Sequence, residues 1–176
     1  MEFNRSAVPV VEYHDRWLLK PLRGRSVSDI LWREDRIELL LYIRSWRMVI
    51  GYDTELSPKS LAKNSPDRHS IRHWSRSEVE DHLSAPILST PFFKSGAARL
   101  GFKNGWNLFT PESERLFDPE LWIEDQLVWT PVGIIASPIL EIHAVDPWTG
   151  RPVTPPHWPG RPENLSYRDD SDDIND

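Results

Sequence analysis

His69 and His73 stand four residues apart, beside Asp67, in a polar stretch of the chain. On a helix this spacing would place two imidazoles on one face, at the separation that zinc ligands need. A zinc site requires three or four ligands, however, and the glutamate of a His-Glu-x-x-His motif is missing here. We therefore interpret the two histidines as solvated linker residues and expect no bound metal.

Other residue types give no catalytic motif. Cysteine is absent from the 176 residues, so thiol nucleophiles, Cys-based metal sites and disulfides are excluded. Acidic residues at 112, 114, 120, 124 and 125 fall in predicted exposed turns, and no pair is placed for acid and base catalysis. The sequence also lacks a Gly-x-Ser-x-Gly elbow and a glycine-rich phosphate loop. We expect no catalytic residue, no cofactor and no enzymatic activity.

A basic segment over residues 59–76 is a candidate partner-binding region. It carries five basic residues against one acid, and its candidate contacts are Lys59, Lys63, Arg68, Arg72, Trp74 and Arg76. Basic groups beside an aromatic ring can hold a phosphate backbone and stack a base. The alternative is that these charges simply solvate a long connection between strands, and both interpretations stay open.

The C-terminal residues 147–176 are rich in proline and then in aspartate, and we expect a disordered tail because this composition buries little apolar surface. Trp148 and Trp158 are candidate contacts, either with the body of the protein or with a partner. Six acids and two bases lie within 161–176, and the candidate partner-binding acids are Asp169, Asp170, Asp172 and Asp173. Much of the net charge of −6 is therefore in the tail, which we hypothesise folds across the basic segment.

Strands must form most of the scaffold that positions these residues. Short β-branched and aromatic runs over 8–53 and 83–145 predict antiparallel hairpins, joined by a basic, partly helical linker over 54–82. A 60-residue offset aligns the two halves, for example Trp46 with Trp106, which indicates either a duplicated unit or two unrelated hairpins of similar pattern. We predict one mainly β domain over 1–146, with one or two short helices and two similar antiparallel units packed as a sandwich or pseudo-twofold domain.

Local signals predict helix starts and turns. Ser57-Pro58 and the capping box Ser75-x-x-Glu78 each mark the beginning of a helix. Asn104-Gly105 predicts a type I′ hairpin turn. Pro138 should either split its apolar run or confine it to a sheet edge.

Export and membrane insertion are not predicted. The N-terminal residues lack the basic start and apolar run of a signal peptide, and no apolar stretch approaches the roughly 18 residues that span a bilayer. With cysteine absent, we expect a cytoplasmic protein without a membrane partner. The oligomeric state stays open.

The second half carries a pattern of spaced apolar residues, a Glu-x-Trp and a Pro and Gly ending. Its residues are Leu100, Phe102, Gly105, Leu108, Glu120, Trp122, Pro131 and Gly133. Over about residues 83–135 this pattern resembles an uncharacterised family of small, mainly actinobacterial β-rich proteins, although Val132 separates the proline from the glycine. The resemblance implies a small β-rich fold, of the kind immunity proteins have, and no known activity.

Two function classes follow. The first is a non-catalytic protein-binding protein, such as an immunity protein that neutralises a bacterial toxin, because a neutraliser needs only a complementary surface. In such a protein the acidic tail could mimic nucleic acid for a nuclease toxin. The alternative is a nucleic-acid-associated or assembly protein that uses the basic segment 59–76. We favour a protein partner because the whole chain is acidic.

Overall fold

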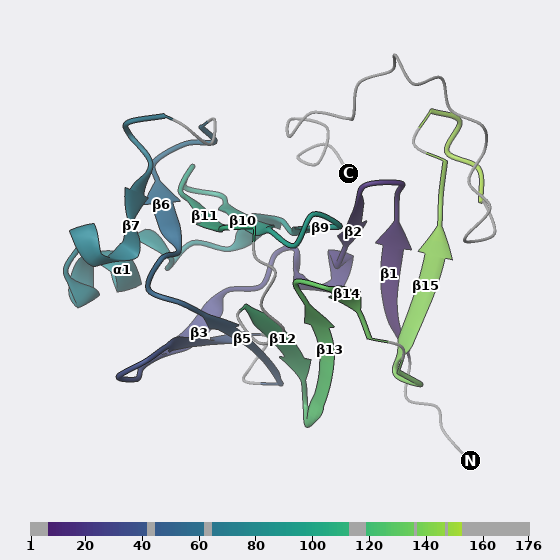
Figure 1. The fold of residues 1–176 in the computed structure, drawn as a ribbon, viewed down its shortest axis with the longest axis horizontal. Coiled ribbons are helices and arrows are strands. Elements are labelled where there is room, and N and C mark those ends of the chain that lie inside the picture. Colours follow the sequence, from purple (N-terminus) through teal and green to yellow (C-terminus); the bar gives the residue numbers. More distant parts are fainter. Residues whose placement is uncertain are drawn as a thin grey trace.

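Two packed sheets make up the fold in the computed structural model (Figure 1). The structure describes residues 7–41, 45–61, 65–112, 119–135, 137–146 and 148–152. Within these ranges the chain is mainly strand with one α-helix, so the predicted β-rich, two-sheet fold is confirmed.

The larger sheet has the order β15-β1-β2-β9-β10-β11-β6-β7, and β8 also pairs with β10. Its strands are β1 Val8–Glu12, β2 Arg16–Leu18, β6 Glu55–Ser57, β7 His69–Ser70, β8 Ile87–Ser89, β9 Pro91–Phe93, β10 Ala98–Phe102, β11 Asn107–Thr110 and β15 Leu140–Ala144. The pair β1 and β15 is parallel, which differs from the antiparallel pairing expected throughout. The two ends of the chain can pair in this way because a long connection separates them.

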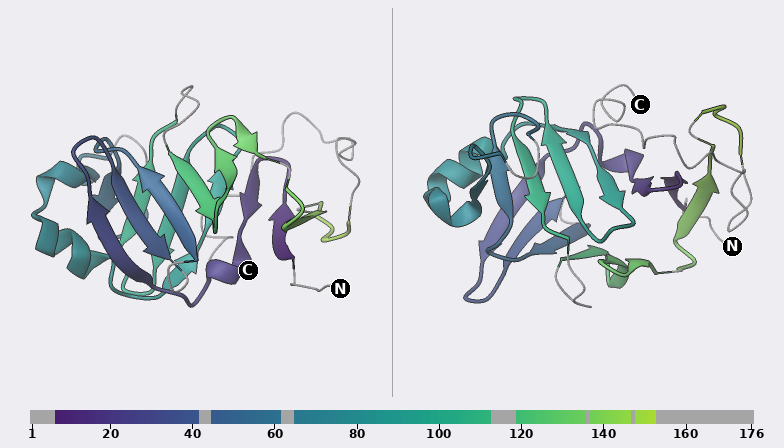
Figure 2. Two further views of the ribbon diagram at one scale, coloured as in Figure 1. Left: turned by 90° about the horizontal axis from the view of Figure 1, so that it is seen from below. Right: turned by 45° about the horizontal axis from the view of Figure 1, so that its top comes forward.

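The smaller sheet has the order β14-β13-β12-β5-β4-β3. Its strands are β3 Val27–Trp32, β4 Ile37–Leu41, β5 Trp46–Ile50, β12 Glu120–Ile123, β13 Gln126–Thr130 and β14 Gly133–Ile134. The first half of the chain supplies β3 to β5 and the second half supplies β12 to β14. Figure 2 shows this sheet lying across the larger one, with β1 and β15 beyond its end.

Alternating side chains of both sheets fill the space between them. In the smaller sheet, Leu39 and Met48 are directly opposite each other and fully buried. Trp129 of β13 and Phe92 of β9 meet across the two layers, with 4.9 Å between ring centroids and an interplanar angle of 72°. Edge-to-face packing of two buried rings fixes how the sheets sit on each other.

The 60-residue offset has a counterpart in the fold. It sets the hairpin of β4 and β5 on the hairpin of β10 and β11, and these two hairpins belong to different sheets. Trp46 and Trp106 both follow the hairpin turn; the first is buried and the second packs partly buried against the core. The other strands do not follow this division, because each sheet contains strands from both halves of the chain. A common origin for the halves stays a prediction.

One of the two predicted helix starts is confirmed. Ser75 caps α1, Arg76–His82, and both bonds of the capping box with Glu78 are present. The start predicted at Ser57-Pro58 is wrong. Ser57 ends β6, opposite Asn107 of β11, and its hydroxyl donates to the carbonyl oxygen of Lys59. Two 3-10 turns, η1 Lys20–Leu22 and η2 Ile71–His73, complete the described helical segments. The predicted linker thus also contributes β6 and β7 to the larger sheet.

The predicted turns are partly correct. Gly105 has a φ of 95°, but Asn104 does not have the positive φ that a type I′ turn requires. Phe102 N donates to Trp106 O, which closes a loop of three residues instead of two. Pro138 does both things that were expected of it, since it lies between β14 and β15, and β15 is an edge strand.

Candidate functional site

Arg68, the central charge of the basic segment, is committed to contacts within the fold. Its Nη2 lies 2.8 Å from Glu55 Oε1, and its side chain is 11% exposed. Its guanidinium also stacks 3.8 Å from the ring centroid of Phe109. Lys59 is exposed just after β6, and Lys63 lies outside the described residues. Arg68 therefore contacts β6 and β11 at one end of the larger sheet, and little of its charged group is accessible to a partner.

The other two arginines of the segment lie over different rings. Arg72 stands 4.5 Å from the centroid of Tyr52, and Arg76 stands 5.2 Å from that of Trp32. Arg68, Arg72 and Arg76 therefore each lie over a different aromatic ring. Both arginines are exposed, so their charges stay accessible while their stems rest on aromatic rings.

Trp74 belongs to a cluster of stacked and edge-on rings. His69 and His73 stack with centroids 4.1 Å apart, and Trp74 packs edge-on against His82 and Trp106. His69 is in β7 and His73 in η2, so the helix that would have set them as zinc ligands is not formed. No group of three or more histidine, aspartate or glutamate side chains among the described residues is placed to hold a metal. The rings close one end of the fold.

Trp148 is the described member of the predicted tail contacts. Its ring stacks on His14 with 5.2 Å between centroids, and its side chain is 47% exposed. Of the predicted tail, the structure describes residues 148–152, and Val145 forms a bridge with Pro152. The remaining predicted contacts, Trp158, Asp169, Asp170, Asp172 and Asp173, lie outside the described residues.

No helix in the described ranges is long and apolar enough to cross a bilayer.

The outer face of the smaller sheet was not predicted as a site. Two rows of directly opposed residues cross it: Leu31, Glu38, Val49 and Glu120, and then Asp29, Leu40, Arg47, Trp122 and Leu127. The neighbouring residues on each strand point into the core, so these rows point away from it. The described core does not include the five apolar members of the rows. An antiparallel sheet face turned to solvent normally carries polar residues, so the five apolar residues on this face require an explanation.

Glu38 organises the charges on this face. Its carboxylate is 7% exposed, and its Oε2 accepts hydrogen bonds of 3.2 Å from the Nε atoms of Arg33 and Arg36. Its Oε1 lies 3.9 Å from Nη1 of Arg47. Arg36 also donates to Asp35 at 3.0 Å. Glu38 is thus the shared counter-ion of three guanidinium groups, and without them its buried charge would be uncompensated.

Arg47 continues from Glu38 to the tryptophan on the next strand. Its guanidinium lies 4.9 Å from the ring centroid of Trp122, a cation–π distance. The indole nitrogen of Trp122 donates to Glu120 Oε1 at 3.0 Å. Glu120 was predicted to lie in a solvated turn, but it is the first residue of β12, and the turn begins at Glu124.

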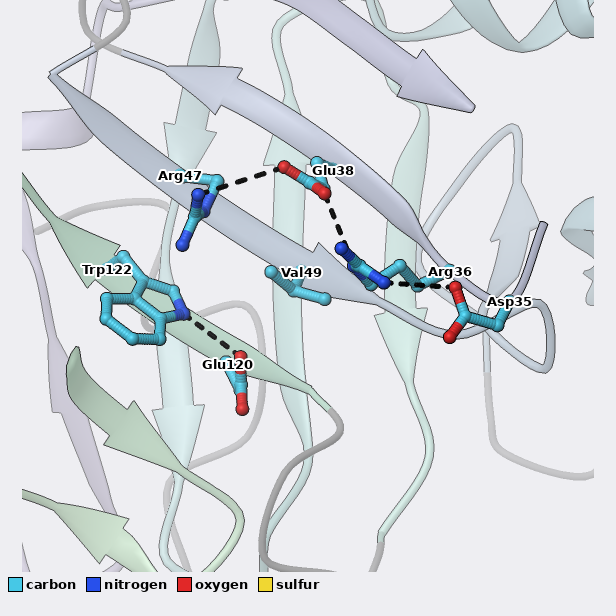
Figure 3. A pocket seen from close by; sticks show the side chains of 7 residues that line it. All are labelled: Asp35, Arg36, Glu38, Arg47, Val49, Glu120 and Trp122. Atoms are coloured by element: carbon cyan, nitrogen blue, oxygen red, sulfur yellow. Dashed lines mark hydrogen bonds and ion pairs between the residues drawn. The ribbon is translucent and has the colours of Figure 1, made fainter. Parts of the chain in front are cut away.

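A hollow of about 380 Å³ opens on this face (Figure 3). Its lining residues are Asp35, Arg36, Glu38, Arg47, Val49, Glu120 and Trp122. Val49, 4% exposed, forms an apolar floor, and charged groups surround it. The lining residues are charged, aromatic and apolar, and none of them is a nucleophile paired with a base. Five of these side chains come from the adjacent strands β4, β5 and β12 and therefore share a rigid base, while Asp35 and Arg36 come from the turn before β4.

A weak sequence signal for this face did exist. Glu38 of β4 and Arg47 of β5 each stand between large apolar residues. A charged residue between apolar neighbours in a strand indicates a side chain that points away from the core. What could not be predicted was that β12 would pair with β5, which brings Glu120 and Trp122 beside Arg47.

The fold and this surface define a mainly β, two-sheet protein with a polar and aromatic hollow on one sheet face. Comparison with models of known protein families, with curated proteins and with solved structures finds no match to the chain.

Proposed function

We propose that the protein binds another protein through the outer face of the smaller sheet. The observation that supports this is the set of apolar side chains at 31, 40, 49, 122 and 127 on the face turned away from the core; Val49 is buried and the other four are half-buried. Apolar area interleaved with ordered charges is typical of an interface, where tryptophan and arginine contribute most of the binding energy.

The fixed arginines strengthen this proposal. Arg36 and Arg47 are 44% and 40% exposed, yet each is held by a carboxylate that is 7% exposed. A partner would therefore meet groups that have already lost most of their conformational freedom, which lowers the entropic cost of binding. The structure has this arrangement of arginines without a bound partner.

The partner that we propose is a bacterial toxin, which the protein would neutralise in the cytoplasm as an immunity protein does. Neutralisation requires a complementary surface and fast association, both of which ordered charges on an open sheet face provide. In the described part of the basic segment Arg68 is largely buried and paired with Glu55, and Arg72 and Arg76 each lie over a separate ring, whereas the arginines of the outer face share one carboxylate. We therefore do not favour nucleic acid as the partner.

Affinity capture from a lysate of the source organism tests this proposal, with and without nuclease. Three baits are compared: the unchanged protein, Trp122→Ala, and Trp148→Ala as a matched control that removes a half-exposed tryptophan from another part of the surface. We expect a stoichiometric protein that survives nuclease, is lost with Trp122→Ala and is retained with Trp148→Ala. Recovery only through nucleic acid, or equal recovery by both variants, would overturn the proposal.

A further inference from the structure

Among the described residues, one carboxylate of the hollow has no basic partner. Asp35 bonds to Arg36, and Glu38 is held by Arg33, Arg36 and Arg47. Glu120 differs, since its contact among the described residues is the indole nitrogen of Trp122. A neutral donor leaves the negative charge of a carboxylate uncompensated.

The surroundings of Glu120 fit a long basic side chain. Glu120 is directly opposite Val49, whose buried side chain forms the floor of the hollow, and Trp122 lies two residues further along the same face. Figure 3 shows Val49 between Glu120 and Arg36. A lysine or arginine could lay its methylene stem on Val49 and against the indole, and place its charged end at Glu120.

An anionic group fits less well. The hollow is lined by three carboxylates and two guanidinium groups, and both guanidinium groups already have carboxylate partners. An anion above Val49 would therefore lie near Glu120 and gain little from arginines that are engaged elsewhere. Complementary charge favours a cation at this place.

We propose that the hollow receives one lysine or arginine side chain of the partner protein, with Glu120 as its counter-ion. This inference rests on the proposed function and adds the chemistry of the group that is recognised. Glu120 then selects among partners, because a partner lacking the basic residue would leave this carboxylate desolvated and unpaired.

A small probe tests the inference without the partner. The full chain, labelled with ¹⁵N, is titrated with Nα-acetyl-arginine amide and with Nα-acetyl-citrulline amide, which has the same shape and no charge. The indole signal of Trp122 reports binding, because its nitrogen is bonded to Glu120. We expect a saturable shift with the arginine probe that weakens with salt, and about tenfold weaker binding of citrulline.

Two variants complete the experiment. Glu120→Gln keeps an acceptor for Trp122 but removes the charge, and Glu34→Gln makes the same change at an exposed residue that does not line the hollow. We expect the first to weaken arginine binding about tenfold and the second to leave it unchanged. Equal binding of the two probes, or an unchanged affinity in Glu120→Gln, would overturn the inference.

The two proposals fail separately. If the arginine probe does not bind but partner capture depends on Trp122, the interface stands and the basic group is excluded. If the probe binds through Glu120 but no captured protein depends on Trp122, the hollow prefers a cation and the proposed function is wrong.

Discussion

Arg47 reaches diagonally across the pair of β4 and β5 to Glu38, with 3.9 Å between Nη1 and Oε1. On its other side the same guanidinium faces the ring of Trp122 on β12. Arg47 thus connects three adjacent strands on the outer face of the smaller sheet. The hollow keeps its shape only as long as Glu38 holds the arginines.

Glu38→Gln should destabilise the protein by about 1–3 kcal/mol, because three guanidinium groups lose their shared charge at a buried position. The free energy of unfolding from urea titration measures this loss. Asp35→Asn is the matched control, since Asp35 is 76% exposed and its loss should stay within about 0.5 kcal/mol. Equal losses in the two variants would show that Glu38 does not organise the cluster.

Trp129→Ala should cost about 3–5 kcal/mol, because the side chain is fully buried and packs edge-on against Phe92 between the sheets. Trp122→Ala removes the same side chain from the opposite face of the neighbouring strand. Its loss should be clearly smaller, since Trp122 is outside the described core. A comparable loss in both variants would mean that the outer face is also part of the core.

Gly105→Ala should destabilise the protein by about 1–2 kcal/mol or more, since the residue has a φ of 95°. An added Cβ would also lie 3.0 Å from the carbonyl oxygen of Pro58. Gly24→Ala is the control for backbone conformation alone, because its φ is 83° and nothing lies within 4 Å of the added atom. Thermal unfolding should rank Gly105→Ala as the more damaging change, and the reverse order would contradict the contact with Pro58.

The capping box of α1 should respond to acid. Hydrogen bonds from the backbone and side chain of Ser75 lower the pKa of Glu78. A lowered folded-state pKa means that this stabilisation is present above the ordinary glutamate pKa and is lost as the pH falls through the lowered value.

Ser75→Ala removes the side-chain bond, so the pKa of Glu78 should move back toward its ordinary value in a carbon-detected NMR titration. Ser84→Ala, at an exposed serine just after α1 whose hydroxyl donates to Asp81 O, serves as the control. A pKa of Glu78 that is unchanged by Ser75→Ala would exclude the side-chain bond as a cause and leave the backbone N–H of Ser75, which alanine retains.

Much of the fold could be predicted from local patterns. The β-branched and aromatic runs of 8–53 do form strands, such as β3, and the Ser75 box does begin a helix. The failure at Ser57-Pro58 arises because a capping signal is weaker than strand pairing with β11. The candidate site could not be predicted, because Glu120 and Arg47 are far apart in sequence and only the pairing of β5 with β12 brings them together.

The central claim is that a protein partner docks on the outer face of the smaller sheet, and photo-crosslinking tests it most directly. A photoreactive phenylalanine is placed at Leu40, on that face, or at Val132, which is 66% exposed in the turn before β14. After irradiation in cells of the source organism, we predict one discrete protein adduct from position 40 that is absent from position 132. The same adducts from both positions, or an adduct from position 132 alone, would contradict the claim.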